Sequence, residues 1–341
     1  MTPKAKKGIL AGGGVLAALL AAELVLRLTG YGAVVPELSF GVNARQGMER
    51  GALVAHPDLF WTLPAPVSEL DRALNAVNPA RPLPPKGDRT RVLVLGDSCS
   101  RLSVRGLPYS AALQRRLGAR YEVLNAAVPG YSSYQGLAWL RLQLLEARPD
   151  VTVIYFGWND HWRATGRTDV DLARRAAPGR LRLLDLLDRP ADPAPLRVPL
   201  DDYRANLETM TAALREIGGR VVLVAAPEDI SAGARAQLVR TGYLLPDDDP
   251  RDLHARYAEA LRACAAAQDA DLFSADELLR QVSLNQPLLH RDGIHPTDVG
   301  HEVLGAALAL LIRDGEGADG MLTGPMLSTA MAAGAAAGDP R

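Results

Sequence analysis

The chain has 341 residues, of which 48% are hydrophobic and 23% are charged, a composition typical of a globular protein with a sizeable core. The 38 Lys and Arg residues nearly balance the 39 Asp and Glu residues, and a formal net charge of −1 does not indicate nucleic-acid binding. Two cysteines exclude a disulfide scaffold, and without a CxxC, HExxH, Walker A or GxGxxG motif the usual signatures of zinc, P-loop and dinucleotide-binding enzymes are missing.

The first 30 residues have the pattern of a membrane anchor. Three lysines precede an apolar run over Gly8–Leu28, which is interrupted only by Glu23 and Arg27. About 20 helical residues span about 30 Å, the thickness of a hydrocarbon core, and lysines before the run place the following chain outside the cytoplasm. A cleaved signal peptide and a buried helix are the alternatives. We expect an uncleaved anchor over residues 1–30, because no A-x-A cleavage site follows the run.

Two further segments flank the predicted domain, which we place at residues 90–313. Residues 31–89 are rich in proline and glycine and contain the aromatic, apolar stretch His56–Pro66. We predict a linker that packs partly on the domain. Residues 314–341 are rich in glycine, alanine and methionine without periodicity, and we predict a disordered tail.

Within the domain, short apolar runs alternate with amphipathic segments. The predicted strands are Val92–Leu95, Glu122–Leu124, Val151–Phe156, Val221–Ala225 and, more weakly, Asp271–Phe273. The predicted helices are Tyr109–Arg116, Tyr134–Glu146, Asp201–Ile217, Leu253–Ala266 and Thr297–Ile312. Continuous apolar strands that alternate with helices indicate a parallel sheet covered on both faces. Two long segments, His161–Leu200 and Pro227–Pro250, contain few such patterns. The first has a possible helix at Leu181–Leu187.

The first and last motifs supply a nucleophile and its base. Ser98 follows Gly-Asp at the end of the first predicted strand, where an open α/β sheet places its ligands. Asp292 and His295, three residues apart, lie on a loop before the last helix. A serine hydroxyl needs a base within hydrogen-bond reach, and that base needs an orienting partner. Taken alone, Ser98 is more simply explained as a turn serine or a helix N-cap, and His295 as an N-terminal cap or a surface residue.

The two middle motifs also follow predicted strands, and both can donate hydrogen bonds to an anion. Gly130 lies in Asn-Ala-Ala-Val-Pro-Gly, where the backbone N–H can approach a ligand closely. Asn159 lies in Gly-Trp-Asn-Asp, and a neutral amide donor stabilises an oxyanion without changing the charge of a nearby base. A loop glycine and an Asn-Asp turn are the structural alternatives.

Taken together, in this order and at strand ends, the four motifs resemble those of the SGNH (GDSL-type) hydrolases, over about Arg91–Ile312. The resemblance implies an α/β, flavodoxin-like, three-layer fold with a five-stranded parallel sheet. It also implies Ser98 as nucleophile, His295 as general base and acid, and Asp292 as its orienting partner. The oxyanion hole would be formed by the backbone N–H groups of Ser98 and Gly130 and the side chain of Asn159. No metal or cofactor is implied.

Several residues near these motifs invite further predictions. Trp158, His161 and Tyr131 are possible substrate contacts, although ordinary packing is the favoured explanation of the aromatic residues. Cys99 directly follows the nucleophile, and we expect it to be a small buried residue that does not pair with Cys264. The acidic run at residues 247–249 is most simply a solvated loop rather than a metal site.

The predicted function is ester hydrolysis through a Ser-His-Asp triad and an acyl-enzyme, on O-acetyl or lipid esters of the cell envelope. Alternatives are an O-acyltransferase acting on envelope glycans and a non-catalytic binder of acylated ligands. Some bacterial SGNH proteins carry an N-terminal anchor with a similar Glu-Leu-x-Leu-Arg stretch, followed by a Leu-Phe-Trp segment, here Glu23–Arg27 and Leu59–Trp61. This similarity implies a single-pass protein of the bacterial inner membrane with its catalytic domain on the periplasmic side.

Overall fold

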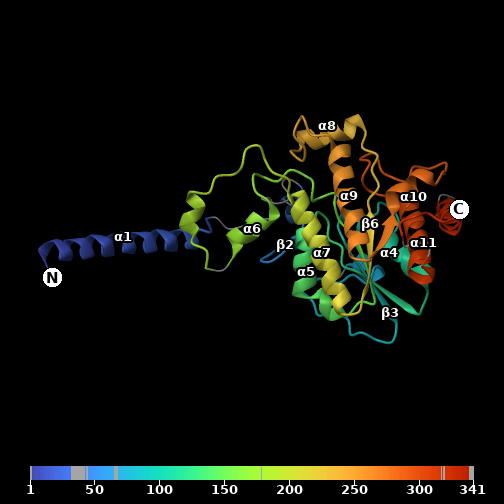
Figure 1. The fold of residues 1–341 in the computed structure, drawn as a ribbon, viewed down its shortest axis with the longest axis horizontal. Helices are drawn as coiled ribbons and strands as arrows, with labels where there is room; N and C mark the ends of the chain where they lie inside the picture. Colours follow the sequence, from blue (N-terminus) through green and yellow to red (C-terminus); the bar gives the residue numbers. More distant parts are fainter. Residues whose placement is uncertain are drawn as a thin grey trace.

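The fold is built on one parallel sheet (Figure 1). The computed structural model describes residues 2–31, 43, 45–64, 68–177, 179–315, 317 and 319–337. The sheet has the order β4-β3-β5-β6-β7, with β3 (Thr90–Gly96), β4 (Tyr121–Asn125), β5 (Val151–Tyr155), β6 (Arg220–Ala225) and β7 (Asp271–Ser274). This order, with the first strand between the second and third, is that of a flavodoxin-like fold. The prediction of a five-stranded parallel sheet is confirmed.

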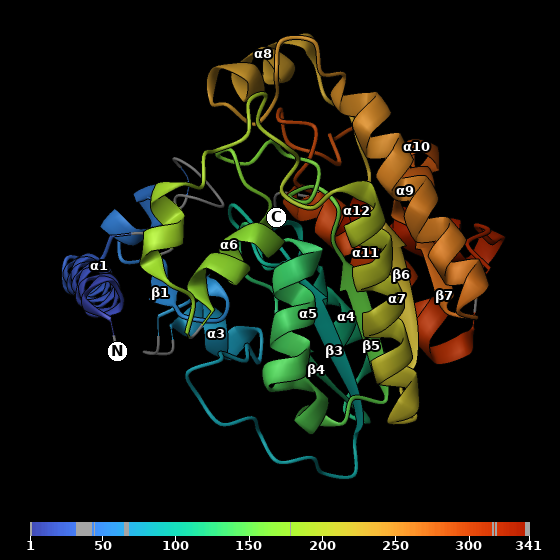
Figure 2. The ribbon, with the colours of Figure 1, turned by 60° about the vertical axis from the view of Figure 1, so that its left-hand side comes forward.

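Helices cover both faces of the sheet, which gives the predicted three layers (Figure 2). Successive residues of β3 face opposite layers: Val92 and Val94 belong to one apolar core and Leu93 and Leu95 to the other. The first core is closed by α4 (Tyr109–Leu117), α10 (Ala275–Gln281) and α11 (Asp298–Asp314). The second core is closed by α5 (Ser133–Leu142), α7 (Leu200–Glu216) and α9 (Pro250–Ala267). A sheet buried on both faces explains the uninterrupted apolar strands.

The segment predicted as a linker contributes to the second core. A hairpin of β1 (Val54–His56) and β2 (Phe60–Thr62) buries Leu59, Phe60 and Trp61, and α3 (Glu69–Ala73) follows it. Phe60 has a φ of +65°, a left-handed conformation that surrounding contacts must hold in place. Residues 32–42, 44 and 65–67 of the predicted linker lie outside the described residues.

The N-terminal segment forms α1 (Pro3–Leu28), which extends away from the domain (Figure 1). No helix among the described residues has the length and apolar character that a membrane span requires, so the predicted anchor over Gly8–Leu28 is not supported. The charged Glu23 interrupts the run and makes contacts within the protein. Its carboxylate accepts the backbone N–H groups of Arg182 and Leu183, each at 3.0 Å.

The C-terminal prediction of a disordered tail is wrong for most of its length. Residues Gly324–Ala337 form α12, which packs along α11 and buries Met326, Ala330 and Ala333. Small residues let the two helices approach closely, since a Cβ on Gly334 would lie 2.9 Å from Val303. Residues 316, 318 and 338–341 lie outside the described residues.

The two long segments contain more helix than their sequence patterns predict. The first contains α6 (Asp169–Ala176) and a 3-10 helix, η3 (Arg182–Leu186), at the predicted helix; the second contains α8 (Ala232–Arg240). Two shorter 3-10 helices are η1 (Ser98–Ser100), directly after β3, and η2 (Leu144–Ala147), after α5. Thr168 and Ser231 cap α6 and α8 by accepting backbone N–H groups three residues ahead.

Candidate active site

Ser98 lies just beyond the carboxyl end of β3, where the chain turns sharply into η1. A Cβ on Gly96 would lie 2.6 Å from the Ser100 hydroxyl and 3.0 Å from the carbonyl oxygen of Tyr155, so glycine is required for this turn. The side chain of Asp97 then caps η1, and its Oδ1 accepts the backbone N–H of Cys99 at 2.9 Å. The turn leaves the Ser98 side chain half-buried at the edge of the sheet.

Three predicted residues meet in one chain of hydrogen bonds. Nε2 of His295 lies 2.9 Å from Oγ of Ser98, and Nδ1 of His295 lies 2.8 Å from Oδ2 of Asp292. Because a carboxylate can only accept, Nδ1 of a neutral imidazole carries the proton and Nε2 accepts the serine hydroxyl. The other carboxylate oxygen, Oδ1 of Asp292, accepts the backbone N–H groups of Ile294 and His295. These contacts orient the imidazole as a base toward Ser98.

The electrostatics of the triad favour a positively charged imidazole. Burial would lower the pKa of His295, but the hydrogen bond and negative charge of Asp292, with the charge of Asp97, raise that pKa above its ordinary value. Burial would likewise raise the pKa of Asp292, but the contacts with His295 and two backbone N–H groups lower it to about 2. Asp292 is therefore ionised at neutral pH, and its negative charge would stabilise the imidazolium formed if His295 took a proton.

Gly293 fixes the loop that carries this pair. Its φ is +73°, and a Cβ there would lie 2.1 Å from the carbonyl oxygen of Asp229. The backbones of the two loops are also joined by a hydrogen bond from the Asp229 N–H to the Gly293 carbonyl, at 2.9 Å. The loop after β6 therefore supports the loop of Asp292 and His295 by direct backbone contact.

The two middle motifs lie at the ends of the strands on either side of β3. Gly130 follows β4 in a left-handed conformation, with a φ of +82°. Asn159 follows β5 and is 4% exposed, and its Nδ2 donates to Oδ2 of Asp97 at 2.8 Å. Burial raises the pKa of Asp97 to about 6 against the contacts with Cys99, His295 and Asn159. One Asn159 N–H bond is thus used to orient the amide, and the second has no partner among the described residues, so it could donate to a bound anion.

Two residues outside the four motifs also reach this edge of the sheet. Nε1 of Trp61 donates to the carbonyl of Pro129 at 3.0 Å, and Nη1 of Arg197 donates to the carbonyl of Gly130 at 2.8 Å. We did not predict either residue as part of the site. For Trp61 the sequence offered one signal, an aromatic segment in a chain with 5% aromatic residues. Arg197, in a long loop, offered none.

The three residues predicted as possible substrate contacts are interior side chains. Tyr131 is fully buried and donates its hydroxyl to the carbonyl of Trp61 at 2.7 Å. His161 is fully buried with Nε2 at 3.2 Å from Nδ1 of His254, and Trp158 stacks on the same His254 ring at 4.0 Å. The structure therefore leaves these three side chains no surface on which to meet a substrate.

The two cysteines are free and buried. Cys99 packs in the first core and Cys264 in the second, so the sheet separates them. Burial raises the pKa of the Cys99 thiol well above its ordinary value, with the charges of Asp97 and Asp292 acting in the same direction. Cys99 is therefore an inert thiol, as expected of a small buried residue.

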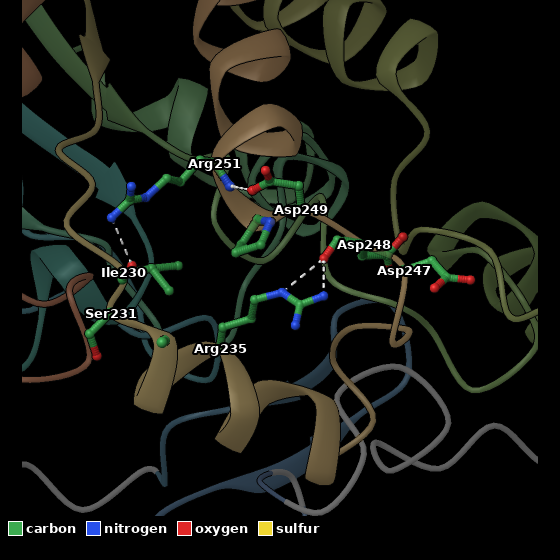
Figure 3. A pocket seen from close by; sticks show the side chains of 9 residues that line it. Ile230, Ser231, Arg235, Asp247, Asp248, Asp249 and Arg251 are labelled. Carbon is green, nitrogen blue, oxygen red and sulfur yellow. Dashed lines mark hydrogen bonds between the residues drawn. The ribbon is translucent and has the colours of Figure 1, made fainter.

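A cavity of about 540 Å³ lies beside the loop after β6, between α8 and α9 (Figure 3). Two of its arginines donate to backbone carbonyl groups: Arg251 to that of Ile230, and Arg235 to that of Asp248. None of the triad residues lines this cavity. The acidic run at 247–249 borders it, with Asp248 in an ion pair with Arg163, and no cluster with metal-ligand spacing occurs among the described residues.

Comparisons with known proteins place the chain in a family. The GDSL-like lipase/acylhydrolase family matches residues 94–303. The isoamyl acetate-hydrolyzing esterase 1 homolog of Mus musculus is 26% identical over 225 residues, which cover 63% of this chain and 78% of that protein. Esterase TesA of Pseudomonas aeruginosa is 40% identical over 98 residues, which cover 26% of this chain and 48% of that protein.

Among solved structures, a lipase/acylhydrolase from Enterococcus faecalis is 22% identical with a TM-score of 0.46, and the match covers 65% of this chain and 94% of that one. The family match spans more than half of the chain and includes all four motifs. The chain therefore belongs to the GDSL-like lipase/acylhydrolase family and is an enzyme that hydrolyses ester bonds.

Proposed function

We propose that the protein is a serine esterase in which Ser98, His295 and Asp292 form the catalytic triad. The observation that carries this proposal is the continuous chain of hydrogen bonds from Oγ of Ser98 through His295 to Asp292, at 2.9 and 2.8 Å. Nε2 of His295 takes the hydroxyl proton as Oγ attacks the ester carbonyl, and then gives it to the leaving alcohol. Water attacks the acyl-enzyme with the same base, releasing the acid and restoring Ser98.

We assign the oxyanion hole to the backbone N–H groups of Ser98 and Gly130 and the side chain of Asn159. No hydrogen bond from either backbone N–H to another group occurs within the described part of the chain. Both remain available for the oxygen that becomes negatively charged in the tetrahedral intermediate. The Asp97 carboxylate fixes the Asn159 amide before substrate arrives, which reduces the reorganisation needed during the reaction.

The substrate class that we propose is an O-acetyl or longer acyl ester of a glycan or a lipid. The triad is open to solvent, with 44% of the Asp292 side chain exposed, so a large alcohol portion can extend outward. Two apolar side chains of the loop after η1 are also exposed, Leu102 at 45% and Val104 at 69%. Leu102 lies beside the nucleophile, since its N–H donates to the carbonyl of Ser98 at 2.8 Å. These residues offer an apolar surface to an acyl chain.

We further propose that the domain acts outside the cytoplasm, at the membrane. Support comes from the lysines that precede the apolar run of α1 and from the exposure of Val15, Leu16 and Leu20, each near 60%. The test is protease digestion of intact spheroplasts followed by detection of the domain. Loss of the domain without cell lysis supports this location, and protection until lysis contradicts it.

Labelling with a fluorophosphonate probe, which reacts with an activated serine, tests the triad. We expect the parent to be labelled and Ser98→Ala and His295→Ala to remain unlabelled while keeping the parent's thermal unfolding. Hydrolysis of 4-nitrophenyl acetate should follow the same pattern, and products formed with and without a glycan acceptor distinguish hydrolysis from acyl transfer. A folded parent that neither labels nor hydrolyses the ester contradicts the proposal.

A further inference from the structure

The peptide unit between Pro129 and Gly130 is held from the side opposite the proposed oxyanion. Its carbonyl oxygen accepts the indole N–H of Trp61 at 3.0 Å. A trans peptide unit is planar, and its C=O and N–H bonds point in opposite directions. The bond from Trp61 therefore fixes the direction of the Gly130 N–H, which donates to no group within the described residues.

The next peptide unit is fixed as well. Its carbonyl oxygen, that of Gly130, accepts Nη1 of Arg197 at 2.8 Å. Arg197 is fully buried and forms an ion pair at 2.9 Å with Asp169, which is also fully buried. The Arg197 guanidinium lies 5.7 Å from the centre of the Trp61 ring. The left-handed turn at Gly130 is thus held on two successive carbonyl groups by donors that are themselves immobilised.

Trp61 is held in turn by residues on the other side of the Gly130 turn. Its carbonyl oxygen accepts the hydroxyl of Tyr131 at 2.7 Å, and the carbonyl of Leu59 accepts Nε2 of Gln135 at 2.8 Å. Phe60 has a left-handed conformation, and the side chain of Trp61 that follows it is fully buried. Trp61 lies outside residues 94–303, which match the family.

We propose that Trp61 is a positioning residue for the oxyanion hole, so that the N-terminal hairpin completes the active site. The inference rests on the proposed function, because it assigns Trp61 a role in presenting the Gly130 N–H to the reacting ester oxygen. A hydrogen bond accepted by a peptide carbonyl also polarises the N–H of the same peptide unit, which makes that N–H a stronger donor. Trp61 acts through Gly130 and does not touch the substrate.

The test compares two conservative variants of fully buried tryptophans. Trp61→Phe keeps an aromatic ring and removes the indole donor. Trp139→Phe is the matched control, because Trp139, on α5, is also fully buried and donates its Nε1 to Gln143 at 3.3 Å. The measurements are kcat and KM for 4-nitrophenyl acetate and for its thionoester, with thermal unfolding of each protein. The thionoester places a larger sulfur atom in the oxyanion position, so the ratio of the two rates reports on the hole itself.

We expect Trp61→Phe to lower kcat for the ester about tenfold with KM nearly unchanged, and to reduce the preference for ester over thionoester. Loss of a complete oxyanion donor costs about a hundredfold or more, and a misdirected donor costs less. Trp139→Phe should keep the parent's ratio. If Trp61→Phe fails to fold, Tyr131→Phe, which removes the hydroxyl that holds Trp61, should lower kcat severalfold with the same change in ratio.

Unchanged kcat and ester-to-thionoester ratio in Trp61→Phe, with an active parent and an inactive Ser98→Ala, overturn the role of Trp61 and leave the triad intact. Equal losses in Trp61→Phe and Trp139→Phe with the parent's ratio show a purely structural effect and overturn it too. A parent that is inactive, by contrast, contradicts the proposed function itself.

Discussion

Two carboxylates raise the pKa of the His295 imidazole, and they differ in how they contact the site. Asp292 contacts Nδ1 directly, whereas Asp97 supports Asn159 and acts on His295 only through its charge. Both charges stabilise the protonated imidazole. At the scale of a single residue, the consequence is that the pH at which half of the His295 side chains are neutral lies above the ordinary pKa of histidine.

The pH dependence of kcat/KM follows from this raised pKa. Activity requires neutral His295, so it should rise with pH and reach half its plateau above pH 6.5, the ordinary pKa of the group. Asp292→Asn removes the negative charge that raises the pKa, so the midpoint should fall while the plateau drops. The exposed Asp314→Asn variant should keep the parent profile. An Asp292→Asn midpoint equal to or above that of the parent contradicts the assignment.

Asn159 gives a second prediction for a single side chain. Asn159→Ala removes an oxyanion donor and should reduce kcat about a hundredfold or more, with little change in KM. Asn78→Ala is a suitable control, because Asn78 donates its Nδ2 to the carbonyl groups of Leu63 and Pro64, at 3.0 and 3.1 Å, and to none of the proposed site residues. Steady-state kinetics on the same ester measure both variants. A loss of less than about threefold in Asn159→Ala would exclude the amide from the oxyanion hole.

The sequence is informative for the residues whose chemistry depends on their own side chains. Ser98, Asn159 and His295 lie in short motifs directly after strands or before a helix, so topology alone brings them together. Trp61 and Arg197 contact the site through backbone carbonyl groups, which every residue possesses. The residue types at positions 129 and 130 therefore do not indicate that their carbonyl groups bind Trp61 and Arg197. These contacts can be identified only from the structure.

At the scale of elements, helices whose composition lacks periodicity were the hardest to predict. The strands of the sheet and the helices α4, α5, α7, α9 and α11 match their predicted positions to within a few residues, whereas α10 was not predicted. α12 consists largely of small residues that show no amphipathic pattern, and it is stabilised by packing against α11. The apolar side chains of α12 are buried against α11, which is itself apolar on most sides. The sequence of α12 therefore shows no pattern from which this helix could be predicted.

The packing of α12 can be measured with two methionines. Met326 is 1% exposed and Met331 is 41% exposed. Met326→Ala should lower the free energy of unfolding by about 2–5 kcal/mol, the usual cost of truncating a buried methionine. Met331→Ala should change it by less than about 0.5 kcal/mol. Urea denaturation of both variants gives the comparison, and equal effects would mean that α12 does not pack on α11 in solution.

At the scale of the whole molecule, the N-terminal region divides into two parts with different contacts. α1 meets the domain mainly near its end, where Glu23 contacts η3. The β1–β2 hairpin instead contributes fully buried side chains to a core that also contains strands of the main sheet. The catalytic domain therefore begins before residue 90, where the sequence predicted its start, and includes the hairpin.

Two truncations test this boundary. Removal of residues 2–31 should leave kcat/KM unchanged, because α1 contacts the domain at η3 and none of its described side chains contacts the triad. Removal of residues 2–63 deletes Leu59, Phe60 and Trp61, whose burial contributes about 2 kcal/mol each, a large share of a typical domain stability. This shorter chain should unfold or lose cooperative melting. A stable and active protein without the hairpin contradicts its place in the domain.

The distance along the chain between Ser98 and His295 has a consequence for synthesis. The two residues are 197 positions apart, and the strands β4 to β7 lie between them. At about 5–20 residues per second, a ribosome adds the serine about 10–40 s before the histidine. The serine hydroxyl has no base during this interval, so in a nascent or prematurely terminated chain Ser98 is an unactivated alcohol without esterase activity. Esterase activity appears only when nearly the whole domain has been made.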